Sequence, residues 1–243
     1  VGTLIAQERI PLTLQSPQPG WAEQNPSAWW KAVQDGFLAL KQNHSNALRK
    51  ARAMSITAGA HIAVLCNAKA EPLRPAILWN DQRASAQAKR LTELGIDTEI
   101  AGNCANPTWT LPQLMWLHDH EPELDFDRIY FAKDWLRAQF TGDHITDPSD
   151  ACGAMLSDYR TEEWSQALCA EAHIKPQQLP KIMPHHELAG TINPRVASEL
   201  GLSSELVIAI GAIDTSAEWL CCGPLKQGAM SLKLASAGVV SVT

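Results

Sequence analysis

The hydrophobic residues of this chain follow two spacings, one typical of helices and one typical of strands. Apolar residues three and four positions apart predict helices, with Ser27 as a first cap and Gly201 as a last stop. We expect helices at residues 27–43, 82–93, 110–119, 133–140, 162–170 and 195–200. Short apolar and β-branched runs predict a strand that enters a loop within residues 1–12, strands at residues 53–57, 62–65, 129–131 and 207–210, and two more within 229–243. This mixture, with a loop-rich stretch at 176–194, predicts a single α/β lobe.

The most informative segment begins at the strand expected over residues 207–210. Gly211 ends this uncharged run, and Asp214, Thr215 and Ser216 are capping residues in front of a helix. Open α/β sheets usually bind their ligands at such strand-to-helix turns. A carboxylate placed there can accept a proton from a substrate hydroxyl during phosphoryl transfer. The alternative is that Asp214 only caps the helix.

The composition is that of an ordinary globular protein, with 45% hydrophobic and 19% charged residues. The net charge of −6 and the lack of a basic stripe argue against nucleic-acid binding. No apolar run has membrane length and no signal peptide is evident, so we expect no membrane partner. The six cysteines show no C-x-x-C spacing. This pattern predicts reduced thiols in a cytoplasmic protein.

Two other groups of residues contain the side-chain types that bind metals. Asp147 and Asp150 lie three positions apart on an expected turn, and His185-His186-Glu187 form a short run. Carboxylates at that spacing more often cap the next segment. The histidine run has no third ligand at a useful spacing. We therefore assign no metal to these side chains.

A set of motifs along the chain resembles one enzyme family. In order, the motifs are WAEQNP at 21–26, WNDQR at 79–83, KDWL at 133–136, TGD at 141–143, TDPSDA at 146–151 and the segment that contains Asp214. Together they resemble the N-terminal domain of the FGGY carbohydrate kinases. The second motif is nearly letter for letter the form found in the xylulokinase branch of that family, and the resemblance runs through nearly the whole chain.

This resemblance implies a ribonuclease H-like lobe of the actin-like ATPase type, with a mixed sheet flanked by helices. Residues 1–243 would then form the N-terminal domain without its first two strands, and the C-terminal domain would be absent. The implied activity is the phosphorylation of a sugar hydroxyl, on a xylulose-like ketose or a polyol, with ATP and Mg²⁺ as cofactors. We expect the isolated fragment to be inactive. Whether the intact protein forms a homodimer stays open.

The resemblance also implies roles for individual residues, with Asp214 as the catalytic base. The sugar would be bound by Ala60, His61, Thr108, Trp109, Asp214 and Thr215. The nucleotide phosphates would be approached by Ser236, Ala237 and Gly238. Two of these assignments have ordinary alternatives, because His61 could be a satisfied histidine at a turn and Trp109 could be a core residue.

Asp81 is expected either in an Asx turn or as a helix cap. Arg83 lies two residues further on and can pair with it. We expect both side chains to support the wall of the cleft rather than to bind the sugar.

Two segments depart from the family pattern. Gly59 and Ala60 replace larger residues, which predicts a roomier pocket floor. The segment 235–238 reads Ala-Ser-Ala-Gly, whereas the family has a Gly-Thr-Ser-Gly-like hairpin whose glycines let backbone N–H groups approach phosphate. These departures keep open an alternative function, a degenerate sugar-binding or regulatory relative without phosphotransfer.

Overall fold

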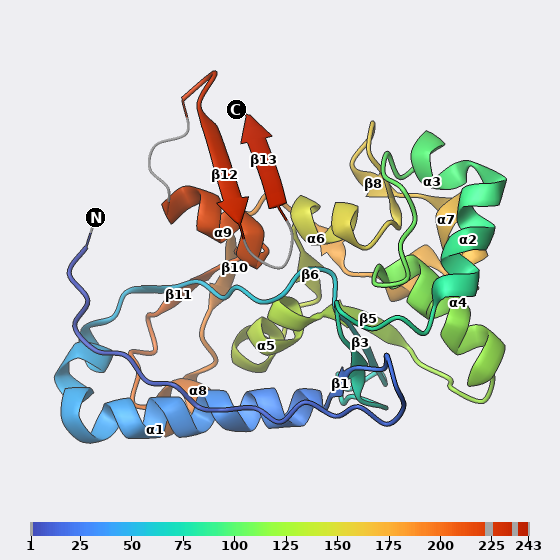
Figure 1. Ribbon diagram of the computed structural model, residues 1–243. Coiled ribbons are helices and arrows are strands. Elements are labelled where there is room, and N and C mark those ends of the chain that lie inside the picture. Colours follow the sequence, from blue (N-terminus) through green and yellow to red (C-terminus); the bar gives the residue numbers. More distant parts are fainter. Residues whose placement is uncertain (1, 222–225, 235–237, 243) are drawn as a thin grey trace.

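The computed structural model describes residues 2–221, 226–234 and 238–242. Its helices are α1 (Pro26–Lys50), α2 (Ser85–Leu94), α3 (Ile96–Glu99), α4 (Thr110–His120), α5 (Ala132–Thr141), α6 (Pro148–Gly153), α7 (Gln166–Glu171), α8 (Pro194–Leu200) and α9 (Asp214–Cys221), with a 3-10 turn at Pro176–Gln178. In Figure 1, α1 runs along one side of the lobe beside α5 and α8, while α2, α3, α4 and α7 gather at one end.

The strands form small sheets rather than one wide sheet. They are β1 (Glu23–Gln24), β2 (Ala53–Met54), β3 (Ala63–Cys66), β4 (Ala76–Ile77), β5 (Arg128–Phe131), β6 (Ile145–Thr146), β7 (Ser157–Asp158), β8 (Glu163–Trp164), β9 (Lys181–Ile182), β10 (Leu188–Thr191), β11 (Val207–Ala209), β12 (Met230–Leu234) and β13 (Gly238–Val242). β11 pairs antiparallel with β10 and parallel with β2, and β3 pairs antiparallel with β5. These mixed sheets with flanking helices confirm the expected α/β class.

Three apolar clusters hold the elements together. The first surrounds α4, in which Thr110 to Leu117 are all buried. The second joins α1 to α5 through Trp29 and Trp135, whose ring centroids lie 6.4 Å apart, edge to face. The third packs α8 and β11 against Phe140, which is also on α5. Because α5 belongs to two of the three clusters, it fixes how the parts of the lobe meet.

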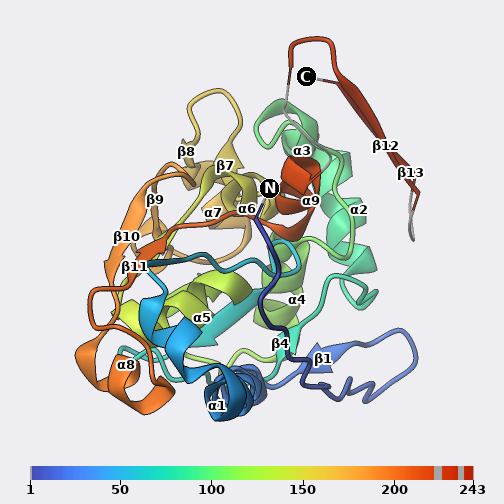
Figure 2. The same ribbon diagram turned by 90° about the vertical axis from the view of Figure 1, so that its left-hand side faces the viewer.

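Several predicted elements are confirmed, with ends that differ by a few residues. α2, α4, α5 and α8 occupy the expected helical segments, and Gly201 ends α8 with a left-handed φ of 75°. The two strands expected near the end of the chain form the hairpin β12–β13, with a register from Met230–Val242 to Leu234–Gly238. Figure 2 shows this hairpin projecting from the lobe.

The first helix begins and ends differently from the prediction. Its cap is Asn25, whose side chain accepts a hydrogen bond of 2.9 Å from the Ser27 N–H, so Ser27 is inside the first turn. Pro26 takes the first helical position, where its missing N–H costs nothing. The helix also continues to Lys50, across a kink at His44 with φ −130°.

Three other expectations were wrong at the level of single elements. Residues 162–170 are not one helix, because Glu162 has a φ of 58° and the strand β8 follows it; α7 begins only at Gln166, capped by Ser165. Residues 2–12 form no strand, since they find no pairing partner among the described residues. The stretch 176–194 contains β9 and β10, so it is less irregular than its prolines suggested.

The backbone conformation at Gly211, which follows β11, predicts that a side chain at this position destabilises the fold. Its φ is 80°, and a Cβ atom there would lie 2.5 Å from the Ile56 carbonyl oxygen. We expect Gly211→Ala to lower the free energy of unfolding by about 2 kcal/mol or more, measured by urea denaturation of the full-length protein. The matched control is Gly36→Ala within α1, where a Cβ meets only Ile10 Cγ1 at 3.7 Å. The control should be neutral or stabilising by up to about 1 kcal/mol, and equal losses in both variants would contradict this account.

Candidate active site

Asp214 is the first residue of α9 and lies at the turn that follows β11. One carboxylate oxygen, Oδ1, accepts the Thr215 N–H at 2.7 Å and the Thr215 hydroxyl at 3.4 Å. Within the described ranges, no hydrogen bond reaches Oδ2. Asp214 and Thr215 are both half-buried. Asp214 therefore lies inside the first turn of α9 rather than at its cap, and one of its oxygens meets no donor among the described residues.

The segment that precedes His61 holds this turn in place. The Thr57 hydroxyl donates to the Ala212 carbonyl at 2.9 Å, and the Asp214 N–H donates to the Ala58 carbonyl at 3.0 Å. These bonds join residues about 155 positions apart in the sequence. They place the Asp214 turn beside the segment that leads into the predicted sugar-binding residues.

His61 occupies a strained turn, with φ 49°, and its side chain is largely buried. Its N–H donates to Asp150 Oδ1 at 2.6 Å, and its carbonyl accepts a hydrogen bond from the Thr110 hydroxyl. The imidazole stacks on Trp109 with centroids 4.6 Å apart. Burial lowers the pKa of His61 to about 4, and it has a larger effect than a hydrogen bond between the ring and the backbone of His61 itself, which raises the pKa. At neutral pH the ring can therefore donate one hydrogen bond and accept another.

The other predicted sugar-binding residues surround this stack. Trp109 is half-buried and packs against the first core cluster as well as against His61, so its two alternative roles are compatible. The Thr108 hydroxyl donates to Asn106 Oδ1 at 3.0 Å, in the turn before α4. Ala60 is half-buried. Its neighbour Gly59 lines an apolar groove of about 470 Å³ beside α1, which we call the α1 groove.

Of the predicted phosphate-binding residues, Ser236 and Ala237 lie outside the described residues. Gly238 begins β13 and pairs with Leu234. Lys233 of β12 forms an ion pair with Glu218 of α9. This ion pair connects the hairpin to the helix that carries Asp214.

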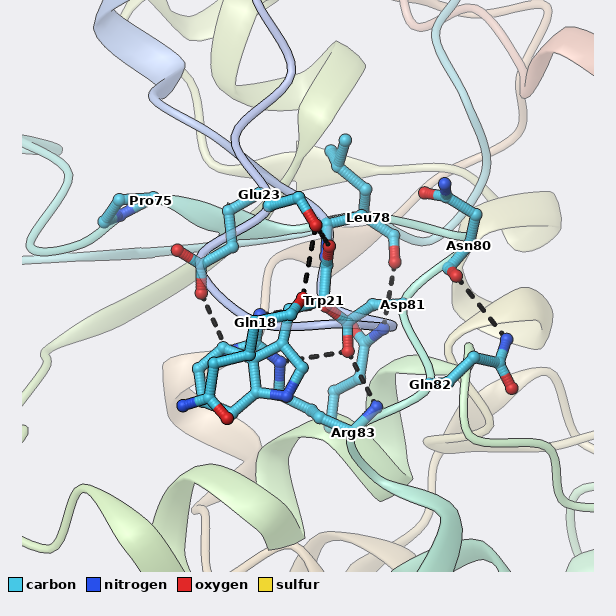
Figure 3. A network of polar contacts seen from close by, with 12 residues as sticks. Gln18, Trp21, Glu23, Pro75, Leu78, Asn80, Asp81, Gln82 and Arg83 are labelled. Atoms are coloured by element: carbon cyan, nitrogen blue, oxygen red, sulfur yellow. Dashed lines mark hydrogen bonds and ion pairs between the residues drawn. The ribbon is translucent and has the colours of Figure 1, made fainter.

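Asp81 and Arg83 form the pair that the sequence suggested (Figure 3). The fully buried Asp81 carboxylate accepts the Ala22 N–H at 2.6 Å and the Arg83 Nη2–H at 2.8 Å. The Arg83 guanidinium lies 3.7 Å from the centroid of the Trp21 ring, as a cation–π contact. With its carboxylate occupied in this way, Asp81 supports the structure.

Gln113 links the segment around Asp81, the expected wall of the cleft, to the turn that contains Trp109. The Gln113 amide donates to the carbonyls of Leu78 and Thr108, at 3.2 Å each. The wall around Asp81 therefore helps to fix the turn that carries the predicted sugar-binding aromatic residue.

The main feature that sequence reasoning missed is a buried charged cluster behind His61. Lys133 Nζ lies 2.6 Å from Asp134 Oδ1, 2.7 Å from Asp147 Oδ1 and 3.1 Å from Asp150 Oδ2. The neighbouring Arg137 donates to Asp134 at 2.7 Å and to the carbonyl of Ile210, at the end of β11, at 2.8 Å. The KDWL and TDPSDA motifs contain most of these residues, but nothing in either motif shows that they meet.

Two further observations apply to the described part of the chain. No three His, Cys, Asp or Glu side chains there are arranged to hold a metal ion. None of its helices combines the length and the apolar character needed to span a membrane.

Comparison with known proteins identifies the family. The sequence model of the FGGY family of carbohydrate kinases, N-terminal domain, matches residues 1–221. The chain belongs to this family. The xylulose kinase of Escherichia coli K12 is 35% identical over 242 residues, which cover 98% of this chain and 49% of that protein. The FGGY chain therefore spans about half the length of the curated relatives it matches.

Solved structures agree with this assignment. A xyloylose kinase from Brucella ovis has a TM-score of 0.90 and 32% identity, over 94% of this chain and 48% of that one. A xylulose kinase from Rhodospirillum rubrum has a TM-score of 0.89 and 27% identity, over 95% of this chain and 48% of that one. The fold class expected from the resemblance is thus confirmed.

The burial of His61 predicts a pH dependence of stability. Below its ordinary pKa of 6.5 the unfolded histidine takes up a proton, whereas the folded one does so only below about 4. Lowering the pH from 6.5 to 4 therefore favours the unfolded state, and the contribution of His61 falls by up to about 3 kcal/mol. Urea denaturation of wild type and His61→Gln across this range measures the difference between them. If that difference does not change with pH, the histidine is not buried in its neutral form.

Proposed function

We propose that this chain is the N-terminal domain of a two-lobed kinase that phosphorylates a hydroxyl of a ketose or polyol, with Asp214 as general base. The observation that carries the proposal is the geometry of Asp214, in which one oxygen accepts the Thr215 N–H while the other meets no hydrogen-bond donor in the described ranges. A free carboxylate oxygen at this position can accept the proton of a sugar hydroxyl. The family of the chain, carbohydrate kinases, supports the reaction class.

The residues around His61 would bind and orient the sugar. The neutral imidazole would hydrogen-bond a sugar hydroxyl as either donor or acceptor. The Trp109 ring, stacked on it, holds the imidazole plane and offers an apolar face. The Asp214 turn is bonded to the segment 57–58, immediately before Gly59 and Ala60. The base and the sugar-binding residues are thus parts of one connected structure.

The cofactors that this activity would need are ATP and Mg²⁺. Mg²⁺ in kinases is held through phosphate oxygens, water and one or two carboxylates rather than by a cage of protein ligands. Because the second oxygen of Asp214 would accept the sugar proton, Mg²⁺ would be held by phosphate oxygens and water. When bound, ATP supplies the phosphoryl group and Mg²⁺ neutralises its charge. The residues that would approach the phosphates are Ser236, Ala237 and Gly238, on the hairpin that Lys233 joins to α9.

The second candidate function is a sugar-binding or regulatory relative that has lost phosphotransfer. The alanines at 235 and 237, where the family has Gly and Ser, motivate it. An assay that couples ADP formation to each of a panel of pentuloses, hexuloses and polyols separates the two functions. We place the kinase in the cytoplasm, in accord with the unpaired cysteines of the described part.

Asp214→Asn tests the base against a purely structural role. Asparagine keeps an oxygen that can accept the Thr215 N–H, so this bond survives while the proton acceptor is lost. We expect kcat of the full-length kinase to fall by about 10²–10⁴-fold, with sugar affinity by calorimetry nearly unchanged. The control is Asp158→Asn, another carboxylate that accepts a nearby backbone N–H, that of Arg160 at 2.9 Å. A variant that keeps more than about a tenth of the wild-type rate excludes Asp214 as the base.

The small residues Gly59 and Ala60 predict the sugar preference. Gly59 and Ala60, next to His61, carry less side-chain volume than the residues that the family has at these positions. Such a floor would accept a larger or differently configured sugar and offers no side-chain donor to xylulose, so xylulose should fit less well. We expect D-xylulose to be a mediocre substrate and another ketose or polyol to have the highest kcat/KM in the panel. If D-xylulose leads every other sugar by about tenfold, or roughly 1.4 kcal/mol, this interpretation of the floor is wrong.

A further inference from the structure

One turn of α6 contacts both the turn that contains Asp214 and the turn that contains His61. Ser149 lies next to the Asp214 turn, and its Oγ accepts the Ile213 N–H at 3.3 Å. Asp150, the next residue, accepts the His61 N–H at 2.6 Å. Figures 1 and 2 both show α6 close to α9. Two adjacent residues thus hold the peptide before the proposed base and the peptide of the proposed sugar-binding histidine.

The charged cluster around Lys133 sets the orientation of the Ser149 hydroxyl through Asp147. The hydroxyl donates to Asp147 Oδ2, while Asp147 Oδ1 lies 2.7 Å from Lys133 Nζ. An ionised carboxylate can only accept hydrogen bonds, so the Ser149 proton points toward Asp147 and a lone pair of Oγ faces Ile213. The side chains of Lys133 and Asp147 are at most 1% exposed. Hydrogen bonds in such an environment are little weakened by water.

The turn before Asp214 has few other fixed points. Gly211 takes a left-handed conformation. The carbonyl of Ala212 and the N–H of Asp214 are bonded to the segment 57–58, whereas the N–H of Ile213 is bonded to Ser149 of α6. Of these three bonds, only the one to Ser149 leads to the charged cluster. A shift of the Ile213 peptide would move the Asp214 carboxylate directly, because the two residues are adjacent.

We infer that Ser149 is a positioning residue, which transmits the fixed geometry of the Lys133 cluster to Asp214 and keeps its carboxylate aligned with the sugar hydroxyl. The inference rests on the proposed function, in which Asp214 is the base. Ser149 need not touch substrate. A misplacement of the base by about 1 Å can cost about 10²-fold in rate without changing how the sugar binds.

The test is Ser149→Ala in the full-length kinase. We expect kcat to fall by about 10- to 100-fold while KM for the preferred sugar changes by less than about twofold. Ser149→Thr keeps an oxygen at the same position and should recover most of the rate. The matched control is Ser165→Ala, since the Ser165 hydroxyl also accepts a backbone N–H, that of Leu168 at 3.4 Å, at the start of α7. This control should leave kcat unchanged.

A second readout does not depend on catalysis. Hydrogen exchange of the Ile213 amide should be faster in Ser149→Ala than in wild type, and close to wild type in Ser149→Thr. If exchange is unchanged, or if kcat of Ser149→Ala stays within about twofold of wild type while Asp214→Asn is inactive, the positioning role is excluded. If Asp214→Asn remains active, the proposed function fails instead, and the exchange result alone decides whether Ser149 holds the turn.

Discussion

The ammonium group of Lys133 lies in the interior of the lobe, with oxygens of Asp134, Asp147 and Asp150 at 2.6, 2.7 and 3.1 Å. A buried charge without partners would cost several kcal/mol. Lys133 and Asp134 belong to α5, whereas Asp147 and Asp150 belong to the start of α6. These two helices must therefore keep their mutual position for the charges to remain paired. Since α5 also contributes to two of the apolar clusters, the cluster ties the core to the site.

The charges of this cluster do not balance. Two cations, Lys133 and Arg137, face an excess of carboxylates, and burial raises the pKa of Asp150 to about 7 although Lys133 opposes the shift. Ion pairs of this kind are weak evidence for stability, since apolar residues of similar volume can replace them without loss. Their geometric effect is clearer, because Arg137 also bonds the carbonyl of Ile210 at the end of β11. The cluster thus reaches the strand before Asp214 as well as the turn beside His61.

Sequence reasoning succeeded where the determining interactions are local. The apolar spacing of α4 and the glycine that ends α8 were sufficient to place those helices, because both signals lie within the element. It failed for residues 162–170, whose helical pattern is interrupted at Glu162 by a left-handed φ and by pairing of β8 with β7. It also failed for the strand expected at residues 1–12, because a strand needs a partner and propensity does not supply one.

The same distinction holds for the candidate site. The sequence by itself determined the family, through motifs spread along the chain. It also determined the carboxylate at the strand-to-helix turn and the pairing of Asp81 with Arg83, since each of these depends on residues close together in the chain. Only the tertiary structure decided which residues surround that carboxylate and His61. Asp150 bonds His61 across 89 positions, and Ser149 bonds Ile213 across 64. Such contacts carry no local signal, because a buried polar group takes whichever partner the packing of distant elements brings within hydrogen-bond distance.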